Sequence, residues 1–329
     1  MATYKGIKGV KVVTKATDPT ASEAIGTVWY NSTSPSALKY AIESAGAWAS
    51  GGDLTTGRSS AAGCGTQTAG LFFAGEPPNT AKTESYNGSA WTEVGDLGGA
   101  LYSAVGGGTQ TAALCVSGTT PSGAITLGVE IWDGTSWTGT GNNINVARTR
   151  GLGSTGGTTT AMLFAGGQVY PTVYSTCETY NGSTWTEVNN MTQARFFSWG
   201  SGTSTAMLAV GGISSPSEPG SQLAKVESWD GTCWTEVNDL NTARGKNNSS
   251  GTQTDALCFG GTPGRSAVTE KYDGTSWTEV ADLSQTRAEA TGFGTTSASL
   301  CAGDDSTPVD EKTEEWNDPV YTIKTVTVS

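Results

Sequence analysis

A short segment recurs along almost the whole chain, and this repeat limits the possible folds more than any other feature. Its first clear copy begins at Glu84 and reads Glu-Ser-Tyr-Asn-Gly-Ser-Ala-Trp-Thr-Glu-Val-Gly-Asp-Leu. Related copies begin at Glu130, Glu178, Glu227 and Glu270, and a shortened copy begins at Glu314. The first aromatic residues of successive copies lie 43 to 49 residues apart. Regular spacing of this size indicates a repeat architecture, in which each unit packs against its neighbours.

Each repeat unit contains recognisable parts in a constant order. An Arg-led stretch comes first, although Leu101 takes the place of the arginine in the second unit. The arginines are Arg58, Arg148 or Arg150, Arg195, Arg244 and Arg287. A Gly-Thr-Gln-Thr-Ala-type strand follows, then a loop, a Glu-x-aromatic strand and a Trp-Thr-Glu-Val strand. Asn-Gly or Asp-Gly joins the last two strands, which indicates a β-hairpin because these residues tolerate positive φ.

These units predict an all-β fold. No apolar residues recur at helical spacing between the strands, which excludes helical repeats. Four short strands in a unit of about 46 residues predict a β-propeller with four-stranded blades. Six units run from residue 57 to the C-terminus, and residues 26–56 resemble a partial unit. Because 329 residues correspond to about seven units, we expect seven blades, with six blades as the alternative.

The predicted domains follow from this count. We expect a short extended arm over residues 1–25 and a propeller over residues 26–329, with the partial blade at 26–56 and the repeats at 57–329. The partial blade lacks its first strand, which residues 7–14 or 325–329 would supply. Joining the two ends of the chain within one blade removes open sheet edges and closes the ring.

The combination Arg…Gly-Gly…Glu-x-Tyr-Asp/Asn-Gly-x-x-Trp resembles the kelch repeat of galactose-oxidase-like propellers, over residues 57–317. The copy at Glu84 is similar to kelch-like repeats in virion and tail-fibre proteins of bacteriophages, especially those of marine cyanobacteria. The Gly-x-Val-Trp-Tyr-Asn-Ser-Thr motif at residues 26–33, followed by Leu38-Lys-Tyr, resembles phage tail-appendage proteins. The resemblance implies kelch-like blades and a structural component of a phage particle, made in the host cytoplasm and located in the virion.

Composition excludes several kinds of chemistry. The chain has no His, which removes Ser-His-Asp nucleophiles, His-dependent metal sites and the copper chemistry of galactose oxidase. It has no Cys-x-x-Cys motif and no phosphate-binding Gly-rich loop, so we expect neither a metal nor a cofactor. The net charge of −12 argues against nucleic-acid binding. No apolar run is long enough to span a membrane, and no secretory signal is visible near residue 1.

The repeated acids and aromatics have structural explanations. Glutamates such as Glu84 recur once in each unit, as a structural device would, so we expect them to pair with the arginine of the unit or with backbone N–H groups. The tryptophans that follow each hairpin turn should pack between blades. Cys115, Cys258 and Cys301 occupy equivalent strand positions in different blades, so disulfides among them are implausible and buried thiols are expected.

Two features remain as candidates for function. The loops after the Gly-Gly strands differ from unit to unit while their flanks repeat, and variable loops on a rigid scaffold are where binding usually resides. The candidate binding residues in these loops are Tyr170, Tyr174, Ser217, Glu218 and Gln222. The second feature is the N-terminal arm, whose first fifteen residues carry four lysines and no acid. These candidate attachment residues are Lys5, Lys8, Lys11 and Lys15.

The sequence therefore predicts a non-enzymatic virion protein with no catalytic residue. Its basic arm would dock on an acidic neighbour, either another virion protein or a second copy of the chain. Its loops would bind a glycan or protein of the host surface. Two alternatives stay open: a capsid or tail decoration protein without a receptor, and a polysaccharide-degrading enzyme that uses acids on a propeller face.

Overall fold

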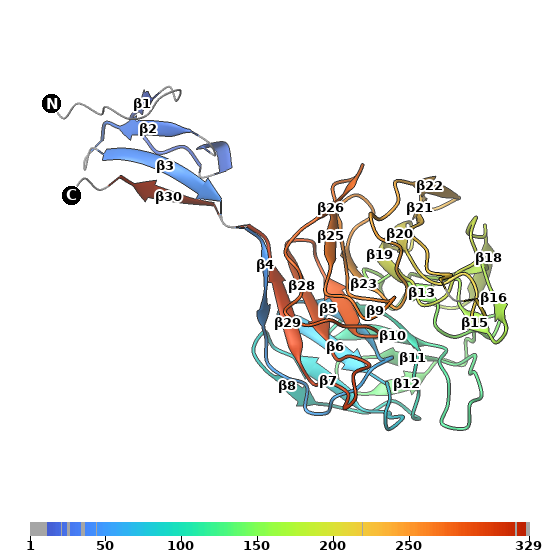
Figure 1. Cartoon of the computed structure of the whole chain (residues 1–329). Coiled ribbons are helices and arrows are strands. Elements are labelled where there is room, and N and C mark those ends of the chain that lie inside the picture. Colours follow the sequence, from blue (N-terminus) through green and yellow to red (C-terminus); the bar gives the residue numbers. More distant parts are fainter. Residues whose placement is uncertain are drawn as a thin grey trace. The chain divides into compact units, whose positions relative to one another are not determined.

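The computed structural model describes residues 12–20, 22–24, 27–33, 37–43, 45–218, 220–319 and 321–326. It divides the chain into two compact units (Figure 1). Unit 1 comprises Met1–Ala47 and Asp318–Ser329, and unit 2 comprises Trp48–Asn317. In the described part of the chain the one helical element is a short 3-10 turn, η1 (Ser22–Ala24). No helix there is long and apolar enough to cross a membrane.

Unit 2 is built from six four-stranded antiparallel sheets, counted over the described residues. The first three sheets, written from the inner strand outward, are β5–β6–β7–β8 (Ala62–Thr66, Ala69–Phe73, Thr83–Tyr86, Trp91–Glu93), β9–β10–β11–β12 (Val105–Thr109, Ala112–Val116, Val129–Trp132, Trp137–Gly139) and β13–β14–β17–β18 (Leu152–Gly153, Met162–Ala165, Cys177–Tyr180, Trp185–Val188). The short hairpin β15–β16 (Gln168–Val169, Thr172–Val173) projects from the third sheet.

The other three sheets continue the same order. They are β19–β20–β21–β22 (Trp199–Thr203, Ala206–Val210, Val226–Trp229, Trp234–Val237), β23–β24–β25–β26 (Asn248–Gly251, Ala256–Phe259, Thr269–Tyr272, Trp277–Glu279) and β27–β28–β29–β4 (Thr291–Gly294, Ala298–Ala302, Thr313–Asn317, Ala47–Ser50). The six inner strands adjoin one another in a closed cycle, because β27 of the sixth sheet lies against β5 of the first. The predicted β-propeller is therefore confirmed.

Over the described residues unit 2 has six four-stranded sheets, which matches the alternative of six blades rather than the expected seven. The last repeat ends after its third strand, β29, and β4 supplies its fourth strand from the other end of the repeat region. The Trp48 indole then takes the place of the usual hairpin tryptophan, 5.7 Å from Trp316 between ring centroids. A strand from the start of the repeat region that completes the last blade ties the two ends of the ring together.

The expected domain boundaries also need correction, because the strands before residue 47 lie in unit 1. There β1 (Val13–Lys15) pairs in parallel with β2 (Val28–Asn31), β2 pairs with β3 (Ala37–Glu43), and β3 pairs with β30 (Tyr321–Thr325). The two ends of the chain do meet in one sheet, but this sheet is not a blade. Its small core contains Ala24, Trp29 and Ala41.

Asp18 stabilises the arrangement of unit 1. Its carboxylate accepts hydrogen bonds from the Trp29 indole at 3.0 Å and the Asn31 amide at 2.6 Å, and it pairs with Lys39. The hydrogen bond from Lys39, followed by those from Asn31 and Trp29, lowers the pKa of Asp18 to about 2. The carboxylate thus ties β2 and β3 to the chain that precedes them.

Small residues line the inner strands because neighbouring blades approach closely there. A Cβ added to Gly200 would lie 2.4 Å from the carbonyl oxygen of Gly153 in the preceding blade, and one added to Gly63 would lie 2.7 Å from Thr291 Cγ2. Contacts this short force the backbone apart. Part of the high glycine content therefore belongs to the ring itself, in addition to the turns.

The hairpin tryptophans join neighbouring blades, as the repeat predicts. The Trp91 indole donates to Thr313 Oγ1 of the sixth blade at 2.9 Å, and the Trp137 indole donates to Thr83 Oγ1 of the first blade at the same distance. Trp48 makes the equivalent bond to Thr269 at 3.0 Å. These three indoles therefore combine a large apolar contact surface with one hydrogen bond to the preceding blade, whereas the indole N–H groups of Trp185 and Trp234 have no hydrogen-bond partner among the described residues.

A buried Arg–Glu pair lies in five of the six blades, which confirms the predicted role of the repeated acids. The pairs are Arg58–Glu84, Arg148–Glu178, Arg195–Glu227, Arg244–Glu270 and Arg287–Glu314. All ten side chains have an exposed fraction of 2% or less. Arg148, rather than Arg150, is the structural arginine of the third blade.

Each pair also satisfies backbone groups of two separate segments. The guanidinium donates to the carbonyl of the first residue after the second strand, as Arg195 does to Gly211 at 2.8 Å. The glutamate lies on the third strand and accepts the N–H three residues before the arginine, as Glu227 does from Thr192 at 2.7 Å. Removing one partner would leave the other buried charge without compensation.

We expect Glu227→Gln to lower the free energy of unfolding by about 3 kcal/mol or more, because Arg195 would remain buried and charged. Glu236→Gln is the matched control. Glu236 lies directly across the strand pair from Glu227, but its ion pair with Lys225 is half exposed, so its loss should cost at most about 1 kcal/mol. Urea unfolding at pH 7 measures both values. Equal effects of the two substitutions would contradict a structural role for the buried pair.

Candidate functional site

The residue two positions after the structural arginine has a left-handed backbone in every blade. Its φ lies between 49° and 59°, although none of the six residues is glycine. The six ring residues are Ser60, Ser103, Arg150, Phe197, Lys246 and Glu289, with Leu101 in the arginine position before Ser103. A left-handed conformation is unfavourable for residues with a Cβ, so surrounding contacts must hold it, and such strain often occurs at functional sites.

A closed cycle of backbone hydrogen bonds holds these ring residues. Each N–H donates to the carbonyl oxygen of the ring residue in the preceding blade, and Ser60 closes the cycle by donating to Glu289. The six N–O distances lie between 2.7 and 3.2 Å. In five blades the buried Arg–Glu pair, whose arginine lies two residues earlier, anchors the segment that leads into the ring residue. The repeat therefore places one side chain from each blade around the propeller axis.

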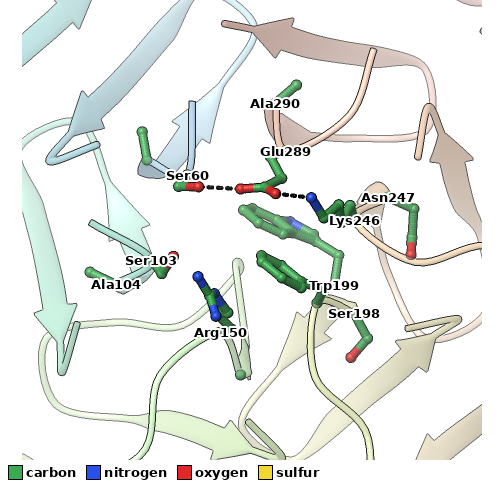
Figure 2. A pocket seen from close by; sticks show the side chains of 13 residues that line it. Ser60, Ser103, Ala104, Arg150, Ser198, Trp199, Lys246, Asn247, Glu289 and Ala290 are labelled. Carbon is green, nitrogen blue, oxygen red and sulfur yellow. Dashed lines mark hydrogen bonds and ion pairs between the residues drawn. The ribbon is translucent and has the colours of Figure 1, made fainter. Parts of the chain in front are cut away.

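These six side chains, which belong to five residue types, line a central pocket together with Trp199 of β19. Figure 2 shows Ser60, Glu289 and Lys246 joined by successive contacts, with Arg150 facing the same pocket. The Arg150 guanidinium lies 4.7 Å from the centre of the Phe197 ring, and Lys246 Nζ lies 5.2 Å from it. Two cations thus lie over one aromatic ring, and each makes a favourable cation–π interaction with it.

Two bases, Arg150 and Lys246, and one acid, Glu289, line this pocket, and two further acids lie near Glu289. Burial, followed by the nearby Glu289 carboxylate, raises the pKa of Glu76, against the opposing effect of Arg150. Burial and then Glu289 raise the pKa of Asp305 in the same way. Lys246 pairs with Glu289 and lies 3.9 Å from Asp305. The pocket therefore offers both donors and acceptors to a polar ligand.

Several polar groups of the pocket lack partners. The lining residues Ser103, Arg150, Ser198, Trp199 and Asn247 each carry one buried polar atom without a hydrogen bond to the described residues. Buried polar groups are nearly always paired in folded proteins, so a cluster of unpaired ones indicates a site for ligand or water. The enclosed volume is only about 40 Å³, which accommodates a few water molecules or one substituent of a larger ligand.

The variable loops lie at the same end of the ring as the central pocket. Their first residues pair with the segments that lead into the ring. The bridges are Ser59–Glu76, Tyr102–Thr119, Thr149–Gln168, Phe196–Ile213 and Gly245–Thr262. The predicted loop face and the pocket therefore belong to one surface, on which the side chains differ from blade to blade.

The candidate loop residues take different places on this surface. Tyr170 lies at the turn of the β15–β16 hairpin and is 72% exposed, whereas Tyr174 is half-buried and its N–H donates to Gly167 O. Ser217 and Glu218 are exposed, and Gln222 pairs with Ile213 across its loop. None of the five lines the central pocket. Their role in binding stays a prediction.

The candidate attachment lysines are described in part. Lys15 is exposed at the end of β1, and its carbonyl accepts the N–H of Ser32 at 2.9 Å. Lys5, Lys8 and Lys11 lie outside the described residues. Their role in attachment also stays a prediction.

All six cysteines carry free thiols. Five are buried, including Cys115, Cys258 and Cys301 as expected, whereas Cys233 is exposed on a hairpin turn. Burial raises the pKa of Cys258 and of Cys301 to about 12. These thiols are therefore protonated near neutral pH and cannot serve as thiolate nucleophiles there.

Sequence reasoning missed the ring residues. A signal was present, because the position two after each arginine varies among Ser, Arg, Phe, Lys and Glu while its flanks repeat. The variation looks like that of a surface loop, since the left-handed backbone and the hydrogen-bonded cycle arise only when six distant segments meet.

Comparison with known proteins supports the β-propeller fold but no particular function. No protein-family model matches the chain, and no curated protein matches it. Among solved structures, YjhT matches with a TM-score of 0.66 and 11% sequence identity, over 83% of this chain and 99% of that chain. In total 380 chains of solved structures match. At such low identity the likeness shows the β-propeller fold, which many different functions share.

We expect Glu76→Gln to stabilise the protein more at pH 7 than at pH 4. The folded chain raises the pKa of Glu76 above its ordinary value of 4.5, so ionisation of Glu76 opposes folding once the pH exceeds that value. Gln removes this penalty, whereas at pH 4 the wild-type side chain is already mostly protonated. Urea unfolding of both proteins at the two pH values measures the difference. If the stability difference between wild type and Glu76→Gln does not grow from pH 4 to pH 7, ionisation of Glu76 does not oppose folding and the prediction is wrong.

Proposed function

We propose that this protein is a non-enzymatic binding component of a bacteriophage particle. In this proposal unit 2 presents its loop face to a glycan or protein of the host surface. Unit 1 attaches the chain to other virion proteins or to a second copy. The protein would be made in the host cytoplasm and act in the virion, without a cofactor. The phage assignment rests on the resemblance of the repeats to kelch-like virion proteins.

One observation carries the binding role: the framework of the blades is constant, whereas the six side chains around the axis belong to five residue types. The same Arg–Glu pair recurs in five blades, but the ring residues include Arg150, Phe197, Lys246 and Glu289. A purely structural ring would tolerate one residue type in every blade. Non-equivalent side chains on an equivalent backbone are what recognition of an asymmetric ligand requires.

The two-unit organisation supports a division between attachment and display. Strands from both ends of the chain, β3 and β30, pair in unit 1, while the repeats occupy unit 2. Unit 1 carries the exposed Lys15. An acidic body with a basic arm can dock on an acidic neighbouring subunit. A decoration protein without a receptor would share this organisation but would not require varied side chains around the pocket.

The enzymatic alternative has one specific observation in its favour. Five of the repeated acids are buried in ion pairs, which makes them unsuitable as acid–base groups. Glu289, however, lines the central pocket, and burial, followed by the nearby Glu289 carboxylate, raises the pKa of Glu76. Two neighbouring carboxyl groups in different environments are a pattern that glycosidases use. This pair is the remaining candidate for hydrolysis.

Binding to polysaccharides and lipopolysaccharides extracted from marine cyanobacteria, immobilised as an array, tests the proposal. We expect the purified protein to bind at least one of them and to release no reducing ends from it. Arg150→Ala should weaken that binding about tenfold or more, because a charged hydrogen-bond donor of the pocket is lost. Thr158→Ala, on a turn at the opposite end of the ring, should leave it unchanged.

Three results would count against this function. Release of reducing ends by the wild-type protein, and its loss in Glu76→Gln, would establish the enzymatic alternative. Absence of binding to every extract would favour decoration without a receptor. Equal weakening by Arg150→Ala and Thr158→Ala would place the binding surface away from the central pocket.

A further inference from the structure

The buried arginines of five blades define what a guanidinium group contacts in this fold. In each blade the guanidinium pairs with the glutamate of the third strand and donates to the carbonyl of the residue after the second strand. In the fourth, fifth and sixth blades it also donates to the carbonyl just before the third strand. One carboxylate and one or two carbonyl oxygens therefore form a site complementary to a planar donor.

The second blade keeps these acceptors without the arginine. Leu101 stands in its place, and its side chain ends in methyl groups. Glu130 still accepts the N–H of Gly98, three residues before Leu101, at 2.9 Å. The counterpart carbonyls belong to Ser117, which follows β10, and to Gly128, which precedes β11. The second blade therefore keeps the glutamate and has residues at both carbonyl positions, while the arginine is missing.

A cavity occupies the region of the missing guanidinium. It has a volume of about 430 Å³ and is lined by Glu130, Leu101, Cys115, Gly128 and Trp137, among others. Phe72, which contacts Arg58 in the first blade, has the smaller Cys115 as its counterpart here. The cavity is open to solvent and large enough for a side chain or a small organic cation.

Glu130 also differs from its five counterparts in exposure. Those five have an exposed fraction of 2% or less, whereas Glu130 is partly exposed. Among the described residues no Lys or Arg forms an ion pair with it. The neighbouring Cys115 reflects this negative charge, because burial and then Glu130 raise the pKa of its thiol.

We propose that this cavity is a binding site for a guanidinium group supplied from outside the chain. The ligand completes the Arg–Glu pair that the second blade lacks: its planar donor faces Glu130 Oε1 and Oε2 and the nearby carbonyls. The source is either a free guanidinium compound or an arginine side chain of a partner protein. A guanidinium is preferred over an ammonium because all five internal copies use Arg and none uses Lys. The site lies apart from the central pocket and does not depend on the function proposed above.

The amide of Gly98 reports directly on this site, because its N–H is bonded to Glu130. In a ¹⁵N-correlation titration of the full chain, ethylguanidinium should shift the Gly98 resonance in a saturable manner at millimolar concentration. Ethylammonium carries the charge without the planar donor, and urea has the planar donor without the charge. Each should bind at least tenfold more weakly than ethylguanidinium. An arginine peptide, acetyl-Gly-Arg-Gly-amide, distinguishes the sources: tighter binding than ethylguanidinium indicates a protein partner, and equal binding indicates a free ligand.

Two variants separate binding from folding. Glu130→Gln should keep the fold, since no buried partner loses its charge, and should weaken ethylguanidinium binding roughly 10- to 100-fold. Leu101→Arg should fill the site from within, raise the melting temperature and abolish the titration of Gly98. Failure of ethylguanidinium to shift Gly98 would overturn the proposal. Equal binding by wild type and Glu130→Gln, or by wild type and Leu101→Arg, would overturn it as well.

Discussion

The buried Arg–Glu pair is the interaction on which the rest of the propeller depends. In five blades it connects the segment before the inner strand, the end of the second strand and the third strand, with both charges removed from solvent. Because burial of an unpaired charge is so unfavourable, the pair defines one arrangement of these three segments. The ring residues follow two positions later, so the same arrangement fixes where each blade reaches the axis. Because the Arg–Glu pair fixes the backbone at this point, the residue type at the ring position can vary from blade to blade.

The pair also relates the two candidate sites of the molecule. At the axis, conservation of the pair in most blades allows Arg150, Phe197, Lys246 and Glu289 to meet around one pocket. In the second blade, loss of the arginine at Leu101 leaves Glu130 beside an open cavity, while the N–H of Gly98 keeps its usual bond. The five blades with a complete Arg–Glu pair therefore show which contacts the second blade loses when Leu101 replaces the arginine.

Much of the fold could be predicted from the sequence, since the strands, the Arg–Glu pairs and the inter-blade tryptophans all follow from residues that recur locally. The blade count could not, because the closing strand β4 is separated from β29 by the whole repeat region. The spacing from Trp48 to Leu54 does equal that from Trp91 to Leu97, which identifies β4 as a displaced outer strand. The ring was missed for another reason: its left-handed residues are held by hydrogen bonds between distant segments, which no local pattern records.

Amide hydrogen exchange at the ring residues tests most directly whether six blades close around this axis. The N–H of Ser60 joins the first and sixth blades, whereas that of Phe197 joins the third and fourth. A closed six-bladed ring predicts that both amides exchange with similar, strong protection, close to that of global unfolding. Rapid exchange at Ser60 beside strong protection at Phe197 would mean that the ring is open between the first and sixth blades, and would contradict the account.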